Sequence, residues 1–206
     1  ELQEAVGGDI WLVRNGKIVP SAPVNYYNNR ASRTCVGITY DGQVVLMVLD
    51  GRQEPFSAGG SAIEIAQIML DAGCVSAINL DGGGSSTFAA RGEGSETISV
   101  VNRPSDGYER SVSSSLLVVS TAKPSNVFDH AVVSADYDYL TVGTELTVNA
   151  SGVTSTGGAI ALPDGSALKV SDESLGTLSG DVFTAKALGD VQIQLIAADG
   201  SVLGTK

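Results

Sequence analysis

Residues 34–49 have the sequence TCVGITYDGQVVLMVL, and this stretch decides the layering of the first half of the chain. It contains two β-rich runs, Thr34–Tyr40 and Gln43–Leu49, joined by the hairpin-turn signal Asp41-Gly42. Val44–Leu49 is apolar at every position, whereas a strand with one face in water alternates between apolar and polar residues. We therefore expect this strand to be covered on both faces.

A second hairpin and a loop are predicted before this stretch. Ile10–Val13 and Lys17–Val19 flank Asn15-Gly16, a residue pair that favours a two-residue hairpin turn. Residues 20–32 are mostly polar, and they include two prolines and three asparagines. That composition predicts a loop.

One helix is predicted after the hairpin, over residues 61–72. Ser61 followed three residues later by Glu64 is the capping-box pattern. Apolar residues then recur at helical spacing as far as Leu70, and Gly73 is a typical helix stop.

Two further apolar runs, Val75–Leu80 and Ser114–Ser120, predict strands that follow the helix. Several strands with a single packed helix favour an α+β domain built on a mixed β-sheet. We place this first domain at residues 1–122.

The second half of the chain predicts an all-β domain at residues 123–206. Lys123-Pro124-Ser125 has the composition of a linker, and no helical period follows it. Short β runs alternate instead with glycine-containing turns, at Leu146–Ala150, Leu168–Val170 and Val191–Ala197. Short strands at regular spacing are typical of a β-sandwich.

The composition bounds the class of protein. Of the 206 residues, 43% are hydrophobic and 17% are charged, which is typical of a folded chain rather than a disordered one. The net charge of -11 disfavours nucleic acid and anionic membranes as partners, because both attract Lys/Arg patches. No apolar run approaches the roughly 18 residues of a membrane span. Glu1 and Glu4 stand where a signal peptide is basic, so we expect the chain to begin inside a larger precursor or after processing.

Two cysteines, Cys35 and Cys74, lie in apolar surroundings and belong to no CxxC pattern. Buried free thiols are favoured over a disulfide, which stays the alternative. A metal site or a nucleophilic cysteine is disfavoured, because the only histidine, His130, lies far along the chain.

The stretch Asn79-Leu80-Asp81-Gly82-Gly83-Gly84-Ser85-Ser86 delivers a carboxylate from an apolar strand into three glycines and two hydroxyls. Successive backbone N–H groups in such a turn can bind an anion, and a carboxylate at a strand end is firmly held. A plain glycine-rich turn is the competing interpretation at about even odds.

Two arginine-containing loops add to this pattern. Asn102-Arg103-Pro104-Ser105-Asp106-Gly107-Tyr108-Glu109-Arg110 precedes an apolar run, and Asp50-Gly51-Arg52 follows the Val44–Leu49 strand. The planar guanidinium fork suits a phosphate. Each loop alone is better explained as an ordinary surface turn, but convergence of these loops would create a cationic pocket in an acidic chain.

The ordered combination of Arg33–Gly37, Asp50-Gly51-Arg52, Asn79–Ser86 and Asn102–Val112 resembles the phosphodiester glycosidase family, over roughly residues 6–120. The resemblance implies hydrolysis of a sugar-1-phosphodiester, such as an N-acetylglucosamine-1-phosphodiester, at the glycosidic C1–O bond. It also implies that a substantial N-terminal portion of the catalytic domain is missing here. This fragment alone is therefore expected to be incomplete, or to pair with the missing segment as a separate chain.

The resemblance implies a role for each candidate residue. Asp81 is the principal catalytic candidate, and Asp50, Asp106 and Glu109 are candidates for a second carboxylate. Cationic and polar residues of the three loops would bind the substrate: Arg52, Asn79, Gly82, Gly83, Ser85, Ser86, Asn102, Arg103, Asp106 and Arg110. No cofactor is expected; Asp81, Asp50 and Asp106 could hold Ca²⁺ or Mg²⁺, but their spacing matches no EF-hand.

Residues 171–185 resemble bacterial immunoglobulin-like repeats, so the complete prediction is an incomplete α+β catalytic domain followed by an Ig-like sandwich. Together the two resemblances imply a secreted or cell-surface bacterial protein with a glycan or sugar-phosphate substrate. The alternative is a non-catalytic carbohydrate or cell-wall binding module. A pure spacer would explain residues 123–206 but not the loops at Asp81 and Asn102.

Overall fold

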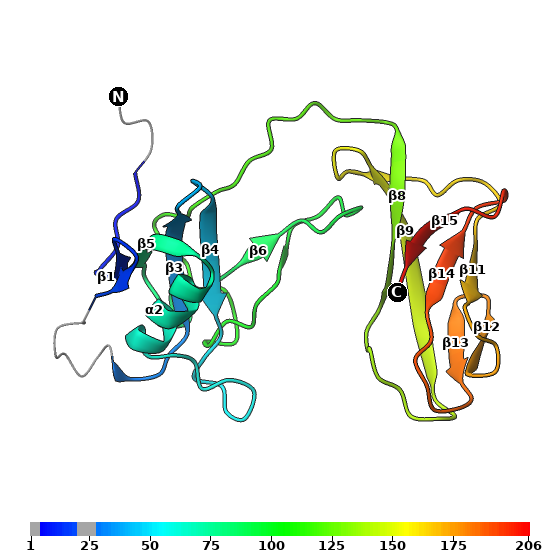
Figure 1. Ribbon diagram of the computed structural model, residues 1–206, viewed down its shortest axis with the longest axis horizontal. Helices are drawn as coiled ribbons and strands as arrows, with labels where there is room; N and C mark the ends of the chain where they lie inside the picture. Colours follow the sequence, from blue (N-terminus) through cyan, green and yellow to red (C-terminus); the bar gives the residue numbers. More distant parts are fainter. Residues whose placement is uncertain (1–4, 20–27) are drawn as a thin grey trace. The chain divides into compact units, whose positions relative to one another are not determined.

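A computed structural model describes residues 5–19 and 28–206, and this part of the chain divides into two compact units (Figure 1). Unit 1 contains the described residues through Ala90 together with Ser99–Val118. Unit 2 contains Arg91–Ile98 and Val119–Lys206. The described helices include none that is long and apolar enough to cross a membrane.

Unit 1 is built on a five-stranded sheet in the order β2-β1-β5-β3-β4. Both predicted hairpins are confirmed: β1 pairs with β2 and β3 pairs with β4, each antiparallel. Asn15 and Gly16 have φ values of 52° and 69°, the left-handed backbone that a two-residue hairpin turn requires. The strand bounds are Ile10–Arg14 (β1), Lys17–Ile18 (β2), Arg33–Thr39 (β3), Val44–Leu49 (β4) and Cys74–Asn79 (β5).

Helix α2 (Ala62–Asp71) lies across one face of this sheet (Figure 1). The predicted capping box is present, because the Ser61 amide donates to Glu64 Oε2 over 2.9 Å while the Glu64 amide donates to Ser61 Oγ over 3.4 Å. Buried helix residues pack on the sheet in one apolar core, made of Leu12, Val13, Cys35, Ala62, Ile65, Ala66, Met69, Cys74 and Ala77.

Gly37 lets the helix approach the middle of the sheet. A Cβ at this position would lie 2.6 Å from Cys74 Sγ and 2.8 Å from the Met69 methyl carbon. Neither distance leaves room for a side chain, so β3 carries glycine where α2 crosses it.

The predicted α+β class with a mixed sheet is wrong. Every strand pairing in unit 1 is antiparallel, and α2 is the only α-helix whose full bounds fall in the described residues, so the structure is mostly β. The helix connects β4 to β5, and such a crossover favours a parallel pair. However, β3 lies between these two strands, so β5 is antiparallel to both of its neighbours.

Three other predictions for unit 1 need comment. Val44–Leu49 was expected to be covered on both faces, and this is wrong, because β4 lies at the end of the sheet and its Val44 is 62% exposed. Ser114–Ser120 was predicted as a strand, and this is wrong, because these residues have no regular secondary structure. Of the predicted loop at 20–32, residues 20–27 lie outside the described residues. The rest of unit 1 contains the short strands β6 (Ala89–Ala90) and β7 (Ser99–Val100), which pair, and the 3-10 turn η1 (Gly83–Ser85).

Unit 2 contains two antiparallel sheets around one apolar core that includes Val148, Phe183 and Leu195. Each of the three predicted β runs overlaps a strand, at Glu145–Thr154 (β9), Ala167–Val170 (β11) and Ile193–Ile196 (β14). One sheet contains β8 (Phe128–Ala135), β9 (Glu145–Thr154), β10 (Ala159–Ile160), β12 (Gly176–Ser179) and β13 (Val182–Ala185); the other contains β11 (Ala167–Val170), β14 (Ile193–Ile196) and β15 (Val202–Thr205). The immunoglobulin-like assignment stays a prediction.

The helix cap gives a first testable prediction. Ser61→Ala removes the acceptor for the Glu64 amide, so we expect the free energy of unfolding of unit 1 to fall by about 1 kcal/mol. Ser61→Asp keeps an acceptor at the cap and is the matched control, with stability close to wild type. Urea denaturation followed by far-UV circular dichroism measures both, and an unchanged midpoint for Ser61→Ala would contradict the role of the cap.

Candidate active site

The glycine-rich loop begins where β5 ends and is fastened to the start of β3. The Leu80 amide donates to the Thr34 carbonyl oxygen over 2.8 Å, and the Gly83 amide donates to the Ser32 carbonyl oxygen over 2.8 Å. The Ser32 hydroxyl donates in return to the Gly83 carbonyl oxygen, also over 2.8 Å. Asp81 is therefore held at the tip of a fixed strand end.

Two arginine-containing loops lie against the glycines, so the three predicted loops converge. Gly83 has a φ of 65°, and a Cβ there would lie 3.1 Å from Arg52 Nη1. A Cβ on Gly84 would lie 2.2 Å from Arg110 Nη2 and 2.3 Å from Asp106 Oδ2. Because only glycine permits this approach, the sequence Gly83-Gly84 brings both guanidinium groups onto the loop.

Asp50 joins two of the loops. Its carboxylate accepts from Asn102 Nδ2 over 2.9 Å and from the Arg103 amide over 3.0 and 3.1 Å. Asn102 also donates to the Ser86 carbonyl oxygen and accepts from the Phe88 amide. Asp50 and Asn102 therefore position the loops, and their polar atoms are engaged within the protein.

The arginines differ in what they contact. Arg110 donates twice to Asp106, over 2.9 and 2.7 Å, so its charge is paired. Arg103 lies over the Phe56 ring, 5.1 Å from its centre. Arg33 is buried and donates to the carbonyl oxygens of Gly60 and Asn29.

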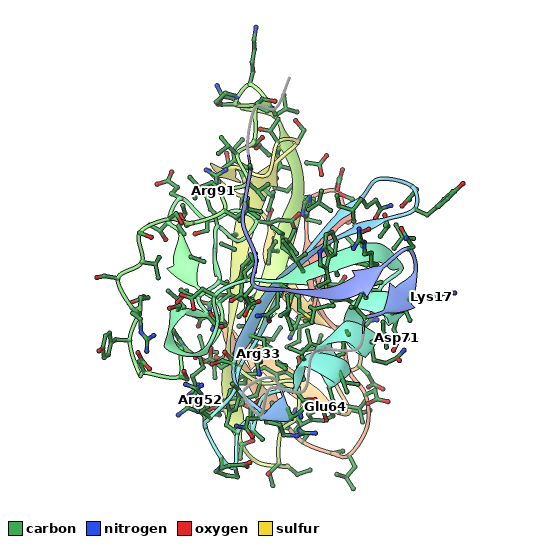
Figure 2. All side chains as sticks on the ribbon, turned by 90° about the vertical axis from the view of Figure 1, so that its left-hand side faces the viewer. Lys17, Arg33, Arg52, Glu64, Asp71 and Arg91 are labelled. Atoms are coloured by element: carbon green, nitrogen blue, oxygen red, sulfur yellow. The ribbon has the colours of Figure 1, made fainter. Side chains whose placement is uncertain are left out.

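Arg52 is the exposed exception. Its guanidinium has no hydrogen-bond or ion-pair partner among residues 5–19 and 28–206. Its backbone has a φ of 58°, an uncommon conformation for a residue with a side chain. The short antiparallel bridge between Gln53 and Ser57 supports this turn. Figure 2 shows Arg52 away from Lys17 and Asp71.

Asp81 is exposed, and its Oδ1 accepts from the Gly82 amide over 2.9 Å. The hydrogen bond and charge of Asp106 raise the pKa of Arg110, and the charge of Asp81 adds to this shift. Asp81 therefore lies within electrostatic range of the paired Arg110 and Asp106. Glu109 is exposed on the same loop.

Two predicted substrate-binding residues are instead buried supports. Asn79 donates to Asp9 Oδ1 and to the Leu80 carbonyl oxygen. Ser86 is buried beside Thr34, whose hydroxyl donates to it over 3.0 Å. Gly82 and Ser85 are half-buried in the loop itself.

Ser32 is a site residue that the sequence did not reveal. Its side chain is 1% exposed and contacts Gly83 and the Ser105 hydroxyl. A Cβ on Gly51 would lie 2.4 Å from the Ser32 amide nitrogen, so the Asp50–Arg52 turn also packs on it. The only signal available was its position next to Arg33, which no residue pattern marks as functional.

The three carboxylates considered as Ca²⁺ or Mg²⁺ ligands are not gathered into one donor set. Asp50 accepts from amides and Asp106 from Arg110, while Asp81 accepts from Gly82. Within the described ranges, no group of three His, Cys, Asp or Glu side chains is arranged to hold a metal ion.

Both cysteines are buried free thiols in unit 1, as favoured from the sequence. Burial raises the pKa of the Cys35 thiol from its ordinary 9.0 to about 12, although the charge of Arg33 opposes the shift. Burial also raises the pKa of Cys74. Both thiols belong to the apolar core, so neither is available as a nucleophile at the loops around Asp81.

Unit 1 is a β-sheet domain that presents a carboxylate at a strand end, a glycine-rich loop and an unpaired guanidinium. Together these features define a class of site for a small anionic ligand. The sequence profile of a family described as phosphodiester glycosidase matches residues 1–119. The chain belongs to this phosphodiester glycosidase family, as its resemblance predicted.

Two curated relatives are similar to part of this chain. The SPbeta prophage-derived uncharacterized protein YomE of Bacillus subtilis (strain 168) is 34% identical over 111 residues, covering 53% of this chain and 16% of its own length. The N-acetylglucosamine-1-phosphodiester alpha-N-acetylglucosaminidase of Bos taurus is 35% identical over 103 residues, covering 43% and 19%. The chain thus spans less than a fifth of either relative.

One solved structure is the catalytic domain of the zebrafish N-acetylglucosamine-1-phosphodiester alpha-N-acetylglucosaminidase, auto-inhibited by its pro-peptide. It is 25% identical, with a TM-score of 0.39, and the match covers 48% of this chain and 34% of that chain.

Ser32 gives a second testable prediction. Ser32→Ala removes the side-chain donor to the buried Gly83 carbonyl oxygen, which keeps the Ser86 amide as its other donor. We therefore expect the free energy of unfolding to fall by about 0.5–1.5 kcal/mol, the net contribution of one hydrogen bond. Ser115→Ala, at an exposed serine of unit 1, is the control and should change stability by less than about 0.5 kcal/mol. Equal urea midpoints for the two variants would show that the Ser32 hydroxyl does not fasten the loop.

The Cys35 thiol predicts a pH dependence of stability. At about pH 7 and below, well under its ordinary pKa, the thiol is protonated in both the folded and the unfolded state. As pH rises from 9 toward 12, the unfolded chain loses this proton and the folded chain keeps it, so stability falls. We expect Cys35→Ala to show a smaller loss of unfolding free energy between pH 8 and pH 10 than the wild type. Parallel pH profiles for both proteins would refute the burial effect.

Proposed function

We propose that unit 1 provides the site of a hydrolase that cleaves a sugar-1-phosphodiester at the glycosidic C1–O bond. The observation that carries this proposal is the unpaired Arg52 guanidinium lying on Gly83, two residues from the Asp81 carboxylate. A guanidinium packed against the loop that carries the carboxylate matches the two ends of the scissile bond, the phosphate and the sugar carbon. Membership of the phosphodiester glycosidase family supports the same chemistry.

Arg52 is assigned to the phosphate. Of the exposed arginines on the three loops, Arg110 is paired with Asp106 and Arg103 lies over Phe56, whereas Arg52 has its five donors available to a ligand. As the C1–O bond breaks, negative charge grows on the phosphate oxygen. A fixed guanidinium stabilises that charge without a proton transfer.

Asp81 is assigned to the sugar carbon. Water adds its oxygen to C1 while the electron pair of the C1–O bond leaves with the phosphate monoester. Asp81 accepts a proton from the water, or bonds first to C1 and is released by water in a second step. In both routes the products are the free sugar and a phosphate monoester, and the carboxylate offsets the positive charge that develops at C1.

Asp106 and Glu109 are the carboxylates left for a second role, because Asp50 is engaged with Asn102 and the Arg103 amide. Asp106 keeps Arg110 oriented at Gly84, which places a paired cation beside Asp81. Glu109, exposed on the same loop, is the candidate for a general acid or base.

The substrate class follows from the relatives rather than from the loop. The bovine relative is by its name specific for an N-acetylglucosamine-1-phosphodiester, and we propose the same sugar here. We further propose that the protein is bacterial and acts outside the cell, on a surface glycopolymer or an exopolysaccharide. We propose that turnover needs a further part of the family domain, and the coverage of 16% of YomE and 19% of the bovine relative is consistent with this.

The test is sugar release from UDP-GlcNAc and from a GlcNAc-1-phosphodiester, measured on the full-length protein. We expect release, and a loss of about 10³-fold or more in kcat for Asp81→Asn, as is usual for a group that acts at the reacting carbon. Asp164→Asn, an exposed aspartate of unit 2, is the control. Glycan binding without any release would favour the non-catalytic binding module instead.

A companion experiment tests Arg52. Arg52→Ala should lower kcat/KM by about 10²-fold, because the developing phosphate charge loses its cation. Arg91→Ala, at an exposed arginine outside the loops, should keep wild-type kinetics. For substrates with a neutral leaving group, Arg52→Ala should lower kcat/KM only slightly. An equal fall in kcat/KM for charged and neutral leaving groups would show that Arg52 does not bind the phosphate.

A further inference from the structure

Phe56 and Arg103 form a flat, exposed surface beside the candidate site. The Arg103 guanidinium lies over the Phe56 ring, 5.1 Å from its centre. Phe56 is 58% exposed, and Arg103 is exposed as well. The proposed reaction gives neither side chain a role. An aromatic ring in water with a guanidinium on its face is the kind of surface on which ligands stack.

A closed turn holds Phe56 in this position. The Gln53 amide donates to the Ser57 carbonyl oxygen over 2.9 Å, and the Ser57 amide donates to the Gln53 carbonyl oxygen over 3.0 Å. The Ser57 hydroxyl donates to the Asp50 carbonyl oxygen over 2.7 Å. Phe56 therefore stands on a short hairpin whose base is fixed next to Arg52.

The backbone of Arg103 is fastened to the same turn. Its amide donates to the Asp50 carboxylate over 3.0 and 3.1 Å, and its carbonyl oxygen accepts from Gln53 Nε2 over 2.6 Å. Asp50 and Gln53 flank Gly51-Arg52 in the sequence, so these bonds hold Arg103 on both sides of the Arg52 position. The stacked pair is thus a fixed neighbour of Arg52.

We propose that the Phe56–Arg103 pair receives the group that is esterified to the phosphate, and that it favours substrates in which this group carries a planar conjugated ring. In the proposed function, Asp81 meets the sugar carbon and Arg52 meets the phosphate. The remaining group of the phosphodiester therefore starts at Arg52, on the turn that carries Phe56. The inference rests on the proposed function for the position of the phosphate, and it adds which leaving group the site selects.

The chemistry of the two side chains favours a flat ring. Phenyl and guanidinium groups both present flat faces, and a conjugated ring stacks on either of them with its whole face. A puckered ring or an alkyl chain of the same size brings fewer atoms to the contact distance. The guanidinium adds cation–π attraction for an electron-rich ring. A planar leaving group therefore gains contacts that a saturated one lacks.

The experiment measures kcat/KM of the full-length protein for the benzyl, cyclohexylmethyl and methyl esters of GlcNAc-1-phosphate. Benzyl and cyclohexylmethyl are close in size, but only benzyl is planar. Phe56→Leu keeps an apolar side chain and removes the ring, so it should lower kcat/KM about tenfold more for the benzyl ester than for the other two. Tyr40→Leu is the matched control, because Tyr40 is a 94% exposed aromatic residue that follows the far end of β3. It should change kcat/KM equally little for all three esters.

Two sources supply a planar ring, an aromatic ester of the phosphate and the base of a sugar nucleotide. UDP-GlcNAc is therefore assayed beside the benzyl ester. A larger fall for UDP-GlcNAc on Phe56→Leu assigns the pair to a nucleobase, and a larger fall for the benzyl ester assigns it to a ring next to the phosphate.

A binding measurement without turnover completes the test. Calorimetry compares benzyl phosphate with cyclohexylmethyl phosphate on the wild type, on Phe56→Leu and on Arg103→Lys, which keeps the charge and removes the plane. We expect the wild type to bind benzyl phosphate about tenfold more tightly than cyclohexylmethyl phosphate, and both variants to lose this preference. Circular dichroism establishes that the variants fold.

The outcomes separate this inference from the proposed function. Sugar release with equal falls in kcat/KM for all substrates on Phe56→Leu, and equal affinity for the two phosphates, would overturn the inference and leave the hydrolysis standing. Benzyl phosphate bound through Phe56 without any sugar release would refute the hydrolysis and support the pair as a ligand site.

Discussion

The buried residue Ser32 is the constraint on which the arrangement of the loops depends. Its backbone carbonyl and hydroxyl both bond Gly83, its amide lies against Gly51, and its hydroxyl reaches Ser105. These contacts bring together three segments that are far apart in the sequence. A buried hydroxyl with two partners fixes their geometry because leaving either partner unpaired in the interior is unfavourable.

Fixed loops explain how an acidic chain can present an unpaired cation to a ligand. The net charge is -11, yet Arg52 and Arg110 both lie on adjacent glycines of one loop. Asp106 neutralises Arg110 and Asp50 bonds backbone and amide groups, so most charges near the site have internal partners. The Arg52 guanidinium, which has no such partner among the described residues, keeps its donors for a ligand.

The sheet of unit 1 is organised around β3, which separates β4 from β5. This position makes every pairing antiparallel, brings the β5 end with Asp81 next to Ser32, and exposes β4 as an edge. The same strand order therefore assembles the site and leaves β4 at the end of the sheet, with β3 as its strand neighbour among the described residues.

The sequence by itself determined the local structure: both hairpins, the capped helix, the buried thiols, the family and the three loops were predictable, because turn residues, caps and apolar periods act over a few positions. The sequence did not determine that β3 lies between β4 and β5, and the α+β mixed-sheet prediction was wrong for this reason. It also did not determine that Ser114–Ser120 forms no strand. Likewise Asn79, Ser86 and Asp50 were candidates by type alone. Only the tertiary structure separated supporting residues from available ones such as Arg52 and Asp81, because burial and partners come from distant segments.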